Sequence, residues 1–233
     1  MISAGDTLRR RLDEVRGRIA AAAARSGRPV ERVTLVGITK TVAAEAVAEA
    51  VALGLSDLGE NRVQEAEAKI AAVGRGAARW HLVGHLQRNK AGRAVELFDR
   101  VHSVDDADLA EALSRRAVAA GRTLPVLVEV NVAGEASKFG VAPEALEPLL
   151  ERAAALPGLR LDGLMTVGPP VREPGEARPV FERLRDLRDR AAARLGLRLS
   201  ELSMGMSGDF EVAVEEGSTL VRVGTAIFGA RPA

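Results

Sequence analysis

Lysine is the residue type whose placement points most directly to chemistry. Only four of the 33 basic residues are lysines, at positions 40, 69, 90 and 138, and the others are arginines. A lysine can lose its proton inside a protein and act as a nucleophile, whereas an arginine cannot. Lys40 follows residues 33–38, an apolar run typical of a buried parallel strand. A lysine at such a strand end could form a Schiff base with an aldehyde.

Two segments near the end of the chain have the composition of a phosphate-binding site. Apolar residues 199–204 and 220–223 are each followed by glycine and hydroxyl-bearing residues. Backbone N–H groups at a helix start attract an anion, and glycine lets the backbone approach it closely. Residues 224–229 have room only for the short extra helix that often carries the phosphate site of an α/β barrel. The residues alone also allow a second interpretation, in which three of them are ordinary caps or turn residues: Ser203, Ser207 and Thr225.

The rest of the chain alternates apolar strands with amphipathic helices. Strands are expected at about 33–38, 57–59, 80–84, 100–103, 126–131, 161–166, 199–204 and 220–223. Helices are expected at about 4–25, 43–53, 61–73, 88–97, 106–120, 143–156, 176–195 and 209–216. This order predicts an α/β fold, a single (β/α)8 TIM barrel with an extra N-terminal helix, in which residues 1–233 form one domain. A doubly wound sheet is the alternative, but no G-x-G-x-x-G follows the first strand.

Composition excludes several classes of function. A net charge of +1 does not suggest a nucleic-acid or membrane partner. Arginines and acidic residues interrupt the first 24 residues, and no apolar run is long enough to span a bilayer, so we expect a cytoplasmic protein. The absence of cysteine excludes thiolate catalysis. The three histidines, at positions 81, 85 and 102, are too scattered to predict a metal site.

The ends of the predicted strands carry the remaining candidates, because the active residues of a barrel gather at that rim. These candidates are Lys40, Asn61, His85, Gln87, His102, Ser103, Asn131, the loop Ser137-Lys138-Phe139-Gly140, Met165 and Arg222. A lysine that faces a phosphate site suggests a Schiff base to a phosphorylated aldehyde, either pyridoxal 5′-phosphate (PLP) or a sugar-phosphate aldol substrate. We expect His102 and Asn131 to be structural hydrogen-bonding groups. No role is assigned to His85, Gln87 or Lys138.

Six segments carry a resemblance to a known family. They are residues 37–41 (GITKT), 59–65 (GENRVQE), 80–90 (WHLVGHLQRNK), 163–165 (GLM), 202–207 (LSMGMS) and 222–229 (RVGTAIFG). In this order they closely resemble the pyridoxal-phosphate homeostasis protein family, the YggS/PROSC group. The resemblance covers almost the whole chain. It implies a TIM barrel like the N-terminal domain of alanine racemase, which holds PLP without known catalytic turnover.

The resemblance also implies roles for individual residues. It implies that Lys40 forms the Schiff base, that Arg222 lies near the pyridine nitrogen and that Asn61 lies near the ring. Met165 is expected in the core or against the ring. If Arg222 faces the pyridine nitrogen, its charge disfavours protonation there and makes the ring a weaker electron sink. The residues implied around the phosphate are Ser203, Met204, Gly224 and Thr225.

Three functions follow from these assignments. The first is a PLP carrier or regulator that makes transient contact with PLP-dependent apoenzymes, has no catalytic residue and is a monomer. The second is a PLP-dependent amino-acid racemase, which this chain fits poorly because it lacks both the length for a second domain and any tyrosine. The third is a Schiff-base aldolase, whose lysine typically lies on a later strand.

Overall fold

Eight parallel strands close into a barrel in the order in which they occur in the sequence. The structure is a computed structural model that describes residues 4–135 and 138–230. Within these ranges, none of the helices combines the length and the apolar character needed to cross a bilayer. The strands are β1 Thr34–Ile38, β2 Asp57–Glu60, β3 Arg79–Leu82, β4 Arg100–Val104, β5 Leu124–Glu129, β6 Leu159–Met165, β7 Glu201–Ser203 and β8 Leu220–Val223.

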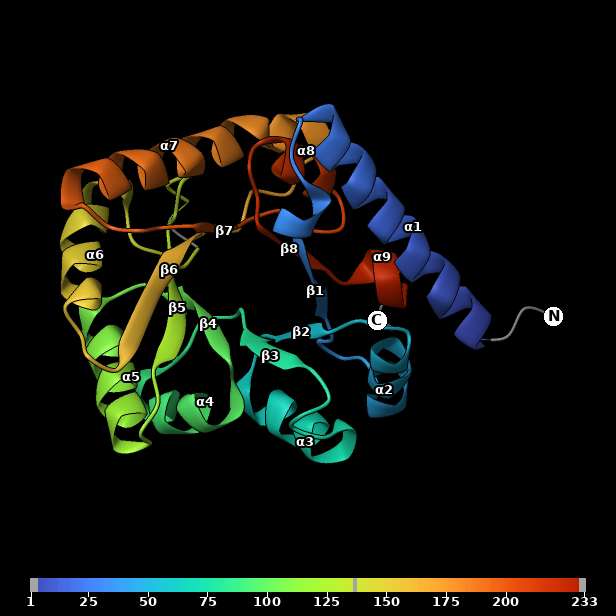
Figure 1. Cartoon of the computed structure of the whole chain (residues 1–233), viewed down its shortest axis with the longest axis horizontal. Coiled ribbons are helices and arrows are strands. Elements are labelled where there is room, and N and C mark those ends of the chain that lie inside the picture. Colours follow the sequence, from blue (N-terminus) through green and yellow to red (C-terminus); the bar gives the residue numbers. More distant parts are fainter. Residues whose placement is uncertain (1–3, 136–137, 231–233) are drawn as a thin grey trace.

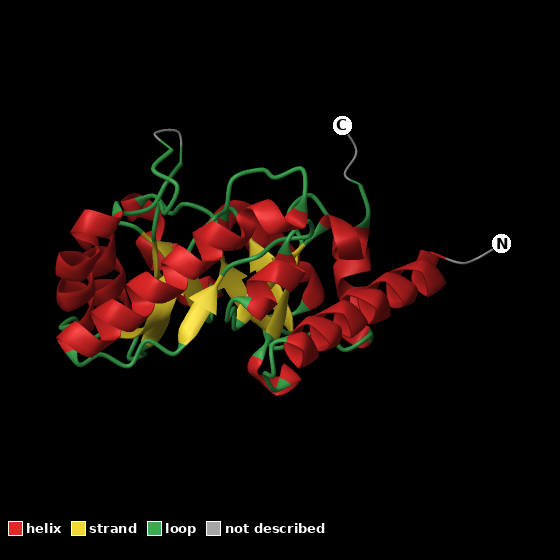
Figure 2. Cartoon of the chain, turned by 90° about the horizontal axis from the view of Figure 1, so that it is seen from above, coloured by secondary structure: helices red, strands yellow, loops and turns green. Residues whose placement is uncertain are grey.

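Helices surround the barrel, and the extra N-terminal helix is present (Figures 1 and 2). The predicted TIM barrel is therefore confirmed. Three expected helices begin as short 3₁₀ turns, at Arg88–Lys90, Pro143–Ala145 and Pro174–Ala177. The α-helices are α1 Ala4–Arg25, α2 Ala44–Ala52, α3 Val63–Val73, α4 Ala91–Leu97, α5 Ala107–Ala119, α6 Leu146–Ala154, α7 Arg178–Leu195, α8 Phe210–Glu215 and α9 Thr225–Phe228.

Helix α1 packs across the end of the chain, against α8 and α9 (Figure 1). Its apolar stripe is buried at the spacing that the sequence predicts, with Leu8, Leu12, Val15 and Ile19 at most 7% exposed. Arg18 also donates a 2.7 Å hydrogen bond to the carboxylate of Glu211 in α8. The extra helix therefore holds in place the segment that follows β8.

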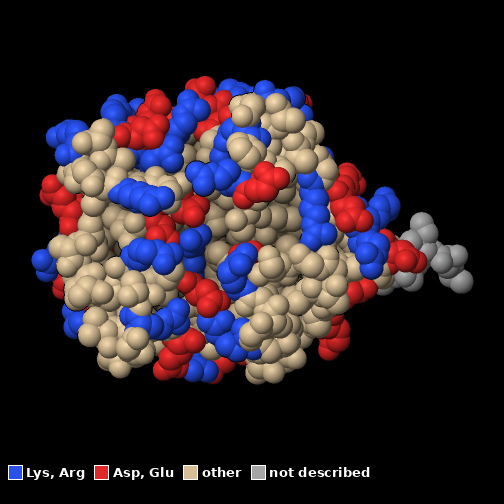
Figure 3. Space-filling view, in the orientation of Figure 1, with Lys and Arg blue, Asp and Glu red and all other residues tan. Residues whose placement is uncertain are grey.

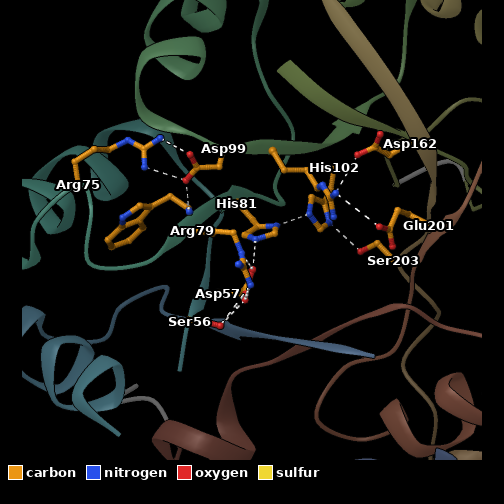
Figure 4. A network of polar contacts seen from close by, with 12 residues as sticks. Ser56, Asp57, Arg75, Arg79, His81, Asp99, His102, Asp162, Glu201 and Ser203 are labelled. Carbon is orange, nitrogen blue, oxygen red and sulfur yellow. Dashed lines mark hydrogen bonds and ion pairs between the residues drawn. The ribbon is translucent and has the colours of Figure 1, made fainter. Parts of the chain in front are cut away.

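The interior of the barrel is only partly apolar. A small cluster of Val36, Leu127, Met165 and Leu220 is fully buried there, with Val167 packed against it. Large apolar clusters elsewhere join the helices to the strands. Polar side chains of β2, β3, β4 and β7 form a buried hydrogen-bonded network (Figure 4), and Arg222 of β8 donates to its Ser203.

Candidate functional site

A pocket of about 380 Å³ lies at the carboxyl ends of β1, β2 and β8. Its size is in the range of small-molecule sites. Five of the eight residues predicted from the sequence line it, namely Lys40, Asn61, Arg222, Gly224 and Thr225. The rest of its wall is formed by Ile38, Val83, Val167, Met206, Ser207 and Gly208.

The turn that carries Lys40 is fixed on both sides. Thr39 donates from its backbone N–H to Gly59 and from its hydroxyl to Glu60, at 3.0 and 2.5 Å. Thr41 has a left-handed backbone, with φ of 62°, and its N–H donates to the Glu65 carboxylate at 2.5 Å. A β-branched residue at positive φ is strained and persists only where its surroundings hold it. The backbone on either side of Lys40 is therefore held by Glu60 and Glu65.

Those two carboxylates are held in turn by Lys69, a buried lysine of α3. Its ammonium group contacts Glu60 at 2.6 Å and Glu65 at 2.8 Å, and it also donates to the carbonyl of Thr39. Burial raises the pKa of Glu60, although Lys69 and Thr39 donate to its carboxylate. Burial also acts to raise the pKa of Glu65, but hydrogen bonds from Lys69 and Thr41 outweigh it and lower that pKa. The backbone turn at Lys40 is thus held by an ionic cluster of Lys69, Glu60 and Glu65.

The opposite side of the pocket is formed by the loop after β7 and by the start of α9. The hydroxyl of Ser207 accepts hydrogen bonds from the N–H groups of Gly224 and Ala226, at 3.2 and 3.3 Å. Thr225 is the first residue of α9, so its N–H has no partner within the helix. These groups converge where an anion could bind, as expected for a short helix after the last barrel strand.

Gly205 shapes the loop that brings Ser207 to this place. Its φ is +92°, and a Cβ there would lie 2.5 Å from the Cβ of Ala213. Asp209 then accepts a 2.6 Å hydrogen bond from the N–H of Met206. The loop can make this turn because glycine allows both the left-handed backbone and the close approach to α8.

Arg222 of β8 is 4% exposed and lines the pocket from below. It donates to the hydroxyl of Ser203 at 2.6 Å and to the carbonyl of Thr166 at 2.8 Å. Burial lowers the pKa of Arg222 to about 10, while the charges of Glu129 and Asp209 act in the opposite direction. Arg222 is therefore still a cation at neutral pH.

Asn61 lies at the end of β2, where the loop after β3 passes very close. A Cβ on Gly84 would lie 2.4 Å from the carbonyl oxygen of Asn61. The N-cap position of α3 belongs to Arg62, so the side chain of Asn61 does not cap that helix. Asn61 instead contributes to the pocket wall.

Three of the predicted residues do not line the pocket. The hydroxyl of Ser203 is buried and bonded to His102 and Arg222. The N–H of Met204 donates to Leu220, and its carbonyl accepts from Ser218. These polar atoms are engaged inside the barrel, and Ser207 is the serine that lines the pocket. The role of Ser203 and Met204 around a phosphate stays a prediction. Met165 is fully buried in the interior apolar cluster, below the pocket.

Other strand-end residues form the rim beyond the pocket. His85 pairs with Asp105 at 3.1 Å and stacks on Phe139, with ring centroids 3.9 Å apart. Burial and the charge of Asp105 raise the pKa of Glu129 to about 7. His102 is hydrogen-bonded inside the barrel, and Asn131 donates to the carbonyl of Glu135 at 2.8 Å. These contacts are compatible with the expectation that both residues are structural, which stays a prediction. Gln87 is exposed beside the turn at Arg88–Lys90, Lys138 donates to the carbonyl of Gly168, and Ser137 lies outside the described residues.

The sequence gives only weak signals for Lys69 and Ser207. Lysine is rare in this chain, but Lys69 falls within a predicted helix and not at a strand end. Ser207 is one of several hydroxyl-bearing residues near a glycine, and the sequence does not distinguish it from the others. The sequence does not indicate the buried hydrogen bond between His81 and His102, because that contact depends on the register between β3 and β4.

The chain is similar in sequence and in structure to several known proteins. Residues 11–232 match the family described as alanine racemase, N-terminal domain. The pyridoxal phosphate homeostasis protein of Pseudomonas aeruginosa is 45% identical over 225 residues, which cover 97% of this chain and 96% of that protein. The pyridoxal phosphate homeostasis protein of Aquifex aeolicus is 43% identical over 221 residues, which cover 95% of this chain and 97% of that protein. The structure of PipY from Synechococcus elongatus PCC7942 with PLP bound has a TM-score of 0.82 and 40% identity, and the match covers 92% of this chain and 100% of PipY.

Proposed function

This chain belongs to the alanine racemase N-terminal domain family and to the pyridoxal phosphate homeostasis proteins, and from that premise we propose that it binds PLP reversibly through a Schiff base on Lys40. The observation that carries the proposal is the pocket itself. It presents one lysine, one arginine and a cluster of N–H and hydroxyl groups around a volume of about 380 Å³. A relative that is 40% identical has been solved with PLP bound, which supports the same ligand here.

The residues present fit three of the polar parts of PLP, namely its aldehyde, its phosphate and its pyridine nitrogen. The amine of Lys40 suits an aldehyde. The phosphate suits the start of α9, where the N–H of Thr225 and the hydroxyl of Ser207 supply donors. The pyridine nitrogen suits Arg222, and Asn61 and Val167 enclose the space between. Met165 supports the floor of the pocket without lining it.

The surroundings of Lys40 support binding more than turnover. Bound PLP supplies an electrophilic aldehyde and, when its ring nitrogen is protonated, an electron sink for carbanions. Arg222 has only donors to offer and stays charged, so it favours an unprotonated ring nitrogen. Among the described residues that line the pocket, the charged side chains are those of Lys40 and Arg222, and an arginine does not give up its proton in a protein. We therefore propose a carrier or regulator with no catalytic residue.

A PLP-dependent racemase is the second candidate. The alanine racemase N-terminal domain match favours it, because it shows the same barrel. Inversion at a carbon needs proton transfer on both faces of the cofactor, and the chain contains no tyrosine that could serve the face opposite Lys40. Among the described residues of the pocket wall, Lys40 is the one amine beside the permanently charged Arg222, which weighs against this alternative.

The proposed setting of the protein is the cytoplasm, as a monomer that contacts PLP-dependent apoenzymes transiently. We also propose that it has no nucleic-acid or membrane partner. A net charge of +1 supports this, because nucleic acids and anionic membranes bind strongly basic surfaces. On the face shown in Figure 3, basic and acidic side chains are interspersed and neither sign dominates.

Titration with PLP, followed by absorbance, tests the proposal in wild type, Lys40→Ala and the control Lys90→Ala. Wild type and Lys90→Ala should bind with equal affinity and the same spectrum, while Lys40→Ala should bind weakly and without the covalent band. Equal affinity in Lys40→Ala would refute the assignment of Lys40. Incubation with L-alanine in D₂O then separates the two functions, because a carrier exchanges the Cα proton no faster than free PLP does. Faster exchange that requires Lys40 would establish an enzyme.

A further inference from the structure

A continuous chain of hydrogen bonds crosses the interior of the barrel beneath the pocket (Figure 4). Asp57 Oδ1 lies 3.0 Å from His81 Nε2, and His81 Nδ1 lies 2.9 Å from His102 Nε2. The far nitrogen of His102, Nδ1, lies 2.9 Å from Ser203 Oγ, which accepts from Arg222 Nη1 at 2.6 Å. The chain therefore runs from Asp57 to the guanidinium group that lines the pocket.

The chain passes through the centre of the barrel. His102 belongs to β4 and Ser203 to β7, and these strands are not neighbours in the sheet. Arg222 of β8 likewise reaches the carbonyl of Thr166, which follows β6. All five members of the chain are at most 4% exposed. Their hydrogen bonds are thus shielded from solvent and strengthened by the low local dielectric.

The two ends of the chain fix the direction of every hydrogen bond in it. Arg222 can only donate, so Ser203 Oγ accepts from it and gives its own proton to His102 Nδ1. His102 then carries its proton on Nε2 and donates to His81 Nδ1. The proton of His81 is on Nε2, where the carboxylate of Asp57 accepts it. In this arrangement each donor faces one acceptor.

We propose that His81, His102 and Ser203 form a one-way hydrogen-bond chain that positions Arg222 as a permanent donor toward the pocket. In this chain each imidazole donates from Nε2 and accepts at Nδ1. His102 and Ser203 are positioning residues, because they act through Arg222 and do not line the pocket. The role of Arg222 toward a pyridine nitrogen rests on the proposed function, whereas the direction of the chain does not.

Charges around the chain keep it in this state. The carboxylate of Asp57 accepts from Arg79 at 2.7 and 2.6 Å, and although burial acts to raise the pKa of Asp57, the hydrogen bonds from His81 and Arg79 lower it well below its usual range. Burial lowers the pKa of His102 far below its usual value, and the charges of Arg222 and Arg100 act in the same direction, as a charge on His81 would. Arg100 is itself paired with Asp162 at 2.9 Å.

A second proton on His81 would reverse the chain. Both nitrogens of His81 would then be donors, and His102 would accept at Nε2 and carry its own proton on Nδ1. Ser203 Oγ would then accept from His102 as well as from Arg222. Among residues 4–135 and 138–230, the hydroxyl of Ser203 has no hydrogen-bond partner other than these two, so its own proton would be buried without an acceptor. A buried unsatisfied donor is unfavourable, which favours the neutral chain.

Nitrogen-15 NMR of the histidine rings tests the direction of the chain in the protein without added cofactor. The chain has only three histidines, so the spectrum holds three ring systems, and the variant His85→Gln assigns the rim histidine by its loss. Expected at pH 8 are two rings with a protonated Nε2 and a bare Nδ1. A protonated Nδ1 on His81 or His102 at this pH would overturn the proposal.

The variants Ser203→Ala and Ser203→Thr test the link to Arg222. Ser203→Ala should shift the Nδ1 resonance of His102, which loses its donor, and should weaken PLP binding about tenfold, equivalent to about 1.4 kcal/mol. Ser203→Thr keeps a hydroxyl and should restore both. If Ser203→Ala moves neither the resonance nor the affinity, the proposal fails. If wild type binds no PLP while the two rings keep the expected protonation, the proposed function is wrong but the proposed direction of the hydrogen-bond chain is supported.

Discussion

Replacement of Lys69 by methionine is the sharpest test of how the Lys40 turn is built. The side chain of Lys69 is 8% exposed and that of Glu60 is fully buried, and their ion pair measures 2.6 Å. Removal of one partner of a buried ion pair leaves the other charge uncompensated and costs about 3–5 kcal/mol. For a chain of this size each 1 kcal/mol lowers the melting temperature by about 2–4 °C, so Lys69→Met should lose roughly 6–20 °C.

The sign of the pH dependence follows from Glu60. Burial already raises its pKa in the folded protein, and the loss of Lys69 removes the main interaction that opposes this rise. A group whose pKa is raised on folding contributes stability below its unfolded pKa, and that contribution is lost as the pH rises through its folded pKa. The deficit of Lys69→Met should therefore be largest at pH 7 and above, and should shrink as the pH falls toward the unfolded pKa of Glu60, about 4.3.

Urea denaturation at pH 5 and pH 8 measures this deficit, with Lys90→Met as the matched control. The double variant Lys69→Met with Glu60→Gln removes both charges and should regain most of the stability that Lys69→Met loses. A loss below about 1 kcal/mol for Lys69→Met would show that the cluster is not a buried ion pair. A double variant as unstable as Lys69→Met would show that the stranded charge is not the cause.

Three further predictions concern the phosphate side, a titrating carboxylate and the loop after β7. Thr225→Ala should weaken PLP binding by about 1–3 kcal/mol, the value of a hydrogen bond to a charged group, and Thr225→Ser should not; equal dissociation constants for all three proteins would remove Thr225 from the site. The pKa of Glu129 is raised to about 7, so its stabilising contribution is present below about pH 4.5 and lost as the pH rises through 7, by about 3 kcal/mol. The midpoint of urea unfolding should therefore fall as the pH rises in wild type, and should fall less in Glu129→Gln. The same pH dependence in both proteins would argue against the raised pKa of Glu129. Gly205→Ala should destabilise by about 2 kcal/mol or more because it combines a left-handed backbone with a Cβ that meets Ala213 at 2.5 Å, and a melting temperature within 2 °C of wild type would contradict this.

The barrel could be predicted because its signals are local. Several strands, such as β1 and β5, are mostly apolar runs, and most helices between strands end near a glycine or proline, although α4 does not. The short helix α9 followed from the room between Gly224 and Gly229. That residues 1–233 form one domain stays a prediction.

The site could be predicted only in part, because its finer features depend on which side chains face inward. Lys40, Gly224 and Thr225 follow strand ends directly, and a strand end is visible in the sequence. Ser203 and Ser207 are both hydroxyls near the same strand end, and only the geometry shows that the first enters the barrel while the second reaches the pocket. Lys69 lies 29 residues beyond Lys40 and meets its turn only through the register of α3 against β2.

The identity of the lysine that carries PLP is the measurement that tests the central claim most directly. The protein is loaded with PLP, reduced with borohydride and digested, and the labelled peptide is identified by mass spectrometry. The account predicts one stable adduct, on Lys40, with the other three lysines unlabelled. Label on Lys69, or label spread over Lys90 and Lys138, would contradict it.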